Sequence, residues 1–211
     1  KRVFFPFDRT TEDDLFSLLR PSGQSQGPRL RDAIKSLKLL RAFNGVIPAG
    51  ITVSNGTIEK ANKPRAHYTS ALKAHAQAVN SSFCEFEIGS LAEQLRNECV
   101  WASSQQAPGN FGGVEQNALG HCESLIARIN TVSTSKELEC IFGGVGQSLV
   151  DEIAGFLSND EKDIALVSFK DVSFEHHTRE VLLNIIGRYL LGLARAGTFK
   201  DKPIVLFLDE A

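Results

Sequence analysis

The chain has 211 residues, of which 42% are hydrophobic and 23% are charged, and its formal net charge is −2. These values are ordinary for a globular protein that buries a core of its own, and they exclude collagen-like and wholly disordered chains. Because no run of about 18 consecutive apolar residues occurs, we expect neither a membrane-spanning helix nor a membrane partner.

The first part of the chain is predicted to be a short strand followed by two helices. Val3–Phe7 is the strand, and Thr11 then precedes three acidic residues, a pattern that begins a helix. That helix stops at Pro21, and Pro28 suits the start of the next one, which continues toward Phe43.

The middle of the chain, residues 44–135, is irregular at first and then largely helical. Asn55-Gly56 stands between apolar residues and predicts a small hairpin. Apolar residues at helical spacing then predict three helices, near 66–79, 90–101 and 115–129. A polar loop at 102–113 separates the last two.

In the last part of the chain, predicted strands and helices alternate as they do in an α/β fold. Residues 164–169 and 203–208 are almost continuous apolar runs, as in strands that are buried on both faces. A long apolar helix is expected between them, over about 175–196. Strand, helix and strand with short loops form a βαβ unit, so the sheet is predicted to be parallel. A strand at 138–142 and a helix at 149–157 are expected before this unit.

Cysteine and methionine usage is informative. Cys84, Cys99, Cys122 and Cys140 form no CxxC or CxxH pair, so a zinc site has little support. We interpret them as buried free thiols, which predicts a cytoplasmic protein. The absence of Met indicates either an interior fragment or a sequence that has lost its Met positions.

The last predicted strand leads into the pair of residues with the clearest chemistry. It ends in Asp209-Glu210, at the edge where an open α/β sheet binds its ligands. An apolar strand followed by Asp-Glu is the Walker B pattern of P-loop nucleotidases. In that chemistry Asp209 would hold the Mg²⁺ shell on the ATP phosphates, and Glu210 would act as general base on the attacking water. The alternative is a core strand that ends in acidic turn residues.

Three stretches together are similar to one known family. They are residues 3–34, residues 164–171, and residues 203–211, where Leu208-Asp209-Glu210-Ala211 matches the family's LDEA. On these stretches the chain resembles the HerA/FtsK-type prokaryotic DNA-translocating ATPases, and HerA-like proteins most closely. The resemblance implies an α/β fold, in which residues 1–43 and 136–211 belong to a parallel-sheet, RecA-like P-loop ATPase core around a helical insertion at 44–135.

The resemblance also implies an activity and partners. The protein would be a DNA translocase or helicase motor that hydrolyses ATP with Mg²⁺ and moves on double-stranded DNA. It would act as a homo-oligomeric, hexameric ring, together with a partner nuclease or defence effector.

One part of the family pattern is missing from the chain. No G-x-x-x-x-G-K-[ST] occurs, and the glycine-rich run at 143–146 is followed by Gln147 where a Lys is needed. We therefore interpret the chain as the portion between Walker A and Walker B, which is expected to be inactive alone. A second hypothesis, a non-catalytic α/β interaction domain whose Asp209-Glu210 merely ends a strand, fits this absence equally well.

Basic side chains provide two further sets of candidate site residues. Ring ATPases need a positive side chain at the γ-phosphate, and Arg188 and Arg195 share a face of the long helix as candidate arginine fingers. Ordinary salt bridges are the alternative for both.

Residues 1–80 hold 13 Lys and Arg against 6 Asp and Glu. The helix in which these basic residues are densest could contact DNA phosphates or form a solvated face. The residues proposed for DNA contact are Arg29, Arg31, Lys35 and Lys38.

Overall fold

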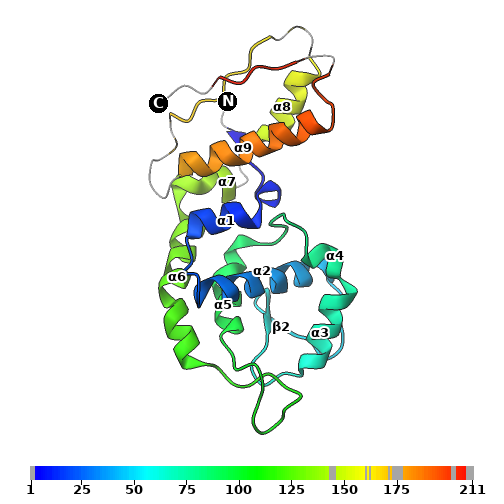
Figure 1. Ribbon diagram of the computed structural model, residues 1–211, viewed down its shortest axis with the longest axis vertical. Coiled ribbons are helices and arrows are strands. Elements are labelled where there is room, and N and C mark those ends of the chain that lie inside the picture. Colours follow the sequence, from blue (N-terminus) through cyan, green and yellow to red (C-terminus); the bar gives the residue numbers. More distant parts are fainter. Residues whose placement is uncertain are drawn as a thin grey trace. The chain divides into compact units, whose positions relative to one another are not determined.

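The computed structural model describes residues 3–142, 146–159, 161, 163–170, 172, 178–200 and 203–207. The chain divides into two units, and Figure 1 shows their helices in sequence colours. We call residues 19–134 the inserted unit and residues 1–18 with 135–211 the split unit, because the first interrupts the sequence of the second.

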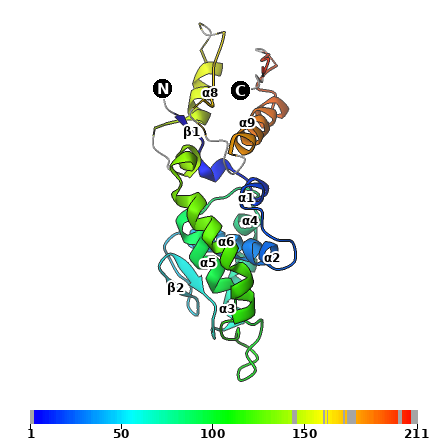
Figure 2. The same cartoon turned by 90° about the vertical axis from the view of Figure 1, so that its left-hand side faces the viewer.

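Helix α2 (Gln26–Ala42) is the central element of the inserted unit. Its apolar residues recur at helical spacing, and Leu30, Ile34 and Leu37 are buried. It packs against α5 (Leu91–Glu98), which in turn packs against α6 (Gln116–Thr134), as both views show (Figures 1 and 2). Because α2 supplies part of its core, the inserted unit spans residues 19–134.

The predicted hairpin is confirmed in the inserted unit. Strands β2 (Thr52–Ser54) and β3 (Thr57–Glu59) pair antiparallel around Asn55-Gly56. Both turn residues have positive φ, 49° and 72°, which is the conformation that Asn-Gly adopts at low strain in a tight hairpin. The hairpin packs on α2 and α5, and the two remaining helices of this unit follow it in sequence. They are α3 (Arg65–Ala74) and α4 (Ala76–Val79).

The predicted loop after α5 is held in place by many hydrogen bonds. Trp101 exchanges backbone hydrogen bonds with Gly112 and Gly113, at 2.8 and 3.1 Å. The Arg65 guanidinium donates to the carbonyls of Ala102 and Pro108, at 3.0 and 2.8 Å. A Cβ at Gly112 would lie 2.5 Å from the Trp101 Cβ, so the close approach of the two chain segments requires glycine there.

The split unit has a small parallel sheet and several helices. Strands β1 (Val3–Phe4) and β4 (Gln147–Ser148) pair in parallel, with Val3 opposite Gln147. The predicted helices are confirmed as α1 (Glu12–Leu19), α8 (Leu149–Leu157) and α9 (Thr178–Arg195). Among the described residues, none of the helices has both the length and the apolar character needed to cross a membrane. The chain is thus an α/β protein with a short parallel ladder.

Three predicted strands differ from the structure. The predicted strand at 138–142 is wrong, since a 3-10 turn (Lys136–Leu138) and α7 (Glu139–Phe142) occupy it. A short apolar run fits a helix as well as a strand. In the structure α7 contacts the start of the chain, where the Phe5 amide donates to the Cys140 carbonyl at 2.7 Å. Residues 164–169 and 203–207 are without strand partners in the described parts of the chain, so the wide parallel sheet of a RecA-like core is not seen.

Candidate functional site

The acidic pair that the sequence places at the end of the last strand, Asp209 and Glu210, lies outside the described residues. The structure describes the approach to it, residues 203–207. The burial predicted for this run is wrong, because Val205 and Phe207 are 77% and 87% exposed.

Arg188, a candidate arginine finger, is bound within the split unit. Thr11 and Asp14 form a reciprocal cap on α1, in which the Thr11 amide donates to the Asp14 carboxylate at 2.8 Å. The Arg188 guanidinium donates to both oxygens of that carboxylate and, at 2.6 Å, to the Thr11 hydroxyl. Hydrogen bonding to Asp14 raises the pKa of Arg188, against the opposing effect of its partial burial. This geometry fits the alternative role of Arg188 as a clamp between α9 and α1.

Arg195, the second candidate finger, stands in a different environment. It is exposed in the last turn of α9, and the structure shows no ion pair for it within the described part of the chain. Of the two arginines on this face, Arg195 has its guanidinium available to a group outside the unit.

The basic face of α2 is largely used inside the inserted unit. Arg29 donates to the Glu98 carbonyl at 2.7 Å and to the Glu115 carboxylate at 2.9 Å. Lys38 is buried, and its ammonium donates to the Ser81 carbonyl. These contacts disfavour the DNA contact predicted for Arg29 and Lys38. Of the other two residues, Arg31 is exposed and Lys35 half-buried.

A buried ionic cluster that the sequence did not reveal lies in the core of the inserted unit. Glu98 is 2% exposed and Lys60 is 5% exposed, and their charged groups form an ion pair. Ser36 donates to the Glu98 carboxylate at 2.6 Å, and Gln94 donates to the same oxygen at 2.9 Å. The Tyr68 hydroxyl lies 2.9 Å from the Ser36 hydroxyl. Each charge therefore has hydrogen-bonded partners, as burial requires.

The surroundings of Lys60 favour its charged form. Burial lowers the pKa of Lys60, but the interactions with Glu98 and Tyr68 together raise it by more, so the net shift is upward. Gln94 fixes the cluster to the hairpin, because its amide accepts from the Ile58 amide at 2.7 Å and donates to the Ile58 carbonyl at 3.1 Å. The sequence signal for this cluster was weak: Gln94 and Glu98 share a face of α5, but Lys60 is remote in sequence.

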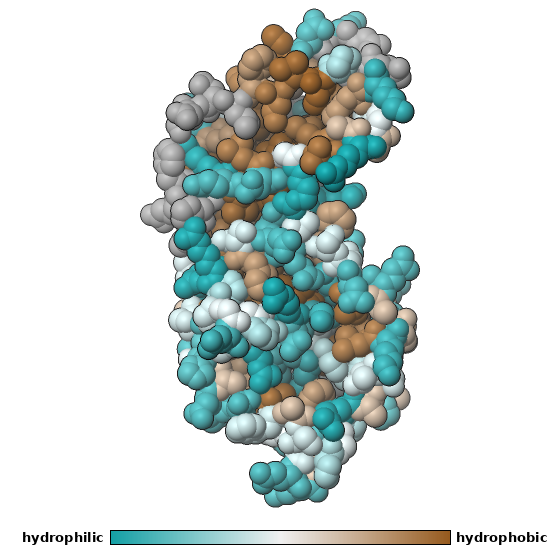
Figure 3. Space-filling view, viewed as in Figure 1, coloured by the Kyte–Doolittle hydropathy of each residue, from teal (hydrophilic) through white to brown (hydrophobic). Residues whose placement is uncertain are grey.

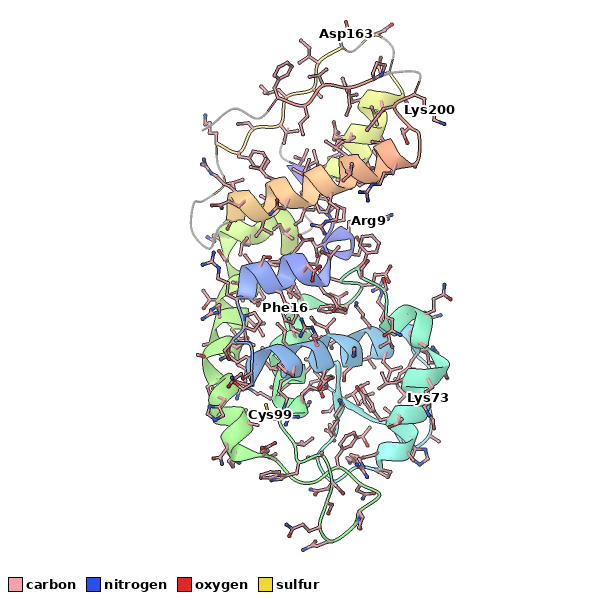
Figure 4. The ribbon with its side chains drawn as sticks, viewed as in Figure 1. Arg9, Phe16, Lys73, Cys99, Asp163 and Lys200 are labelled. Carbon is pink, nitrogen blue, oxygen red and sulfur yellow. The ribbon has the colours of Figure 1, made fainter. Side chains whose placement is uncertain are left out.

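The thiols are free, as predicted, and three of the four are buried. Cys99 directly follows α5 (Figure 4), and its thiol donates to the Leu95 carbonyl at 3.3 Å. Burial raises the pKa of Cys99 to about 12 and raises that of Cys122 as well. Thiols that keep their protons are poor nucleophiles at neutral pH.

The split unit contains a hollow. It has a volume of about 1180 Å³ and lies between the β1–β4 ladder, α8 and residues 164–168. Lys136, Asp151 and Glu152 are its charged lining residues. Within the described residues, no group of three or more His, Cys, Asp or Glu side chains could hold a metal ion.

Comparison with known proteins gives no relative: no family model, no curated protein and no solved structure matches the chain.

Removing Glu98 is expected to destabilise the protein strongly. Glu98→Ala leaves the Lys60 ammonium buried without its partner, and we expect the free energy of unfolding to fall by about 3–5 kcal/mol. Urea unfolding measures this. The control is Glu93→Ala, whose side chain is 56% exposed in a surface pair with Arg96, with an expected loss below about 1 kcal/mol. Equal effects of the two variants would contradict the structural role of the cluster.

Stability is expected to fall in alkali, in part through Cys99. The unfolded thiol ionises near its ordinary pKa of 9.0, whereas the native thiol keeps its proton to about pH 12. Above pH 9 the native state therefore holds more protons than the unfolded state, and the free energy of unfolding falls by up to about 1.4 kcal/mol per pH unit. Urea unfolding between pH 8 and 10.5 should show a shallower decline in Cys99→Ala than in the wild type. Identical slopes would argue against this assignment.

Proposed function

We propose that this chain is part of an ATP-hydrolysing motor of the HerA/FtsK type, which couples Mg²⁺-ATP hydrolysis to movement on double-stranded DNA. One observation carries the proposal: the apolar run at 203–208 ends in Asp209-Glu210-Ala211. Helix α9 between the extended segments 163–170 and 203–207, and the parallel β1–β4 ladder, are consistent with it. The proposal places the motor in the cytoplasm, as a hexameric ring with a nuclease or defence effector.

The donor chemistry at the end of the run suits magnesium. Mg²⁺ keeps several waters and takes one or two carboxylates together with substrate phosphates, so Asp209 would supply one carboxylate, through water. The bound ion would neutralise charge on the phosphates. Glu210, the neighbouring carboxylate, would accept the proton of the attacking water. The phosphate-binding loop and its lysine would come from polypeptide outside these residues.

The roles of Arg188 and Arg195 are assigned from their contacts and exposure in the split unit. The Asp14 carboxylate holds Arg188, which suits a structural role, whereas Arg195 is exposed at the end of α9. We therefore assign Arg195 as the candidate arginine finger. On α2, the internal contacts of Arg29 and Lys38 leave Arg31 and Lys35 as the better candidates for the DNA surface.

Replacing the proposed base should stop the reaction without preventing ATP binding. In the full-length protein, we expect Glu210→Gln to lower kcat by about 100-fold or more, because the water loses its proton acceptor. ATPase assays with and without duplex DNA, together with nucleotide binding, measure the two steps. The matched control is Glu161→Gln, an exposed glutamate of the same unit. Unchanged turnover in Glu210→Gln, or a wild type without turnover, would favour the interaction-domain hypothesis.

The two arginines should separate by phenotype. Arg195→Ala should lower kcat by about a thousandfold without changing thermal stability, since a finger acts only on the developing phosphate charge. Arg188→Ala should destabilise the protein by about 1 kcal/mol or less, because the pair with Asp14 is partly solvated, and should affect kcat much less. The reverse pattern would transfer the finger role to Arg188.

A further inference from the structure

We draw no further inference here: the strongest candidate, the exposed apolar side chains of residues 164–167 and 205–207 in the split unit (Figure 3), carries none because nothing in the structure shows what covers them.

Discussion

The inserted unit depends on the Glu98 carboxylate. A buried carboxylate is tolerated only when its charge is compensated and its lone pairs are filled, and here Lys60, Ser36 and Gln94 do so together. Lys60 follows the hairpin, Ser36 lies on α2, and Gln94 lies on α5 with Glu98 itself. Hydrophobic packing would allow these elements to slide, but the four-way contact fixes their register because each shift leaves a buried charge or amide unpaired.

Among the described residues of the split unit, no comparable buried ionic cluster occurs. A two-residue ladder and the Arg188–Asp14 clamp connect its elements, and Phe7 packs edge-on against Phe142 of α7, at 5.3 Å between ring centroids. Its most hydrophobic segments remain exposed. The two units therefore differ: the inserted unit pairs its buried Lys60 and Glu98 internally, whereas the described apolar segments of the split unit, 164–168 and 203–207, are largely exposed. Because the inserted unit pairs its buried ionic cluster, the exposed apolar segments are a property of the split unit itself.

Local signals explain which parts of the fold were predictable from the sequence. Thr11 with Asp14, Asn55-Gly56 and the helical periodicity of α2 act within a few residues, and each gave the correct element. The run at 138–142 did not, because a short apolar run fits a helix as well as a strand. The Lys60–Glu98 pair could not be inferred, since only the folded hairpin brings the two residues together. The candidate pair Asp209-Glu210 rests on its sequence pattern alone.

The basic character of the first 80 residues shows why charge counts are a weak guide to nucleic-acid binding. Arg29 and Lys38 give their hydrogen bonds to backbone carbonyls, and Lys60 is neutralised in the core. Long basic side chains bury their stems and satisfy carbonyls at helix and loop ends, a use that sequence patterns do not separate from a solvent-facing one. These three basic side chains are therefore structural, and a DNA-contacting surface on this chain needs cations beyond them.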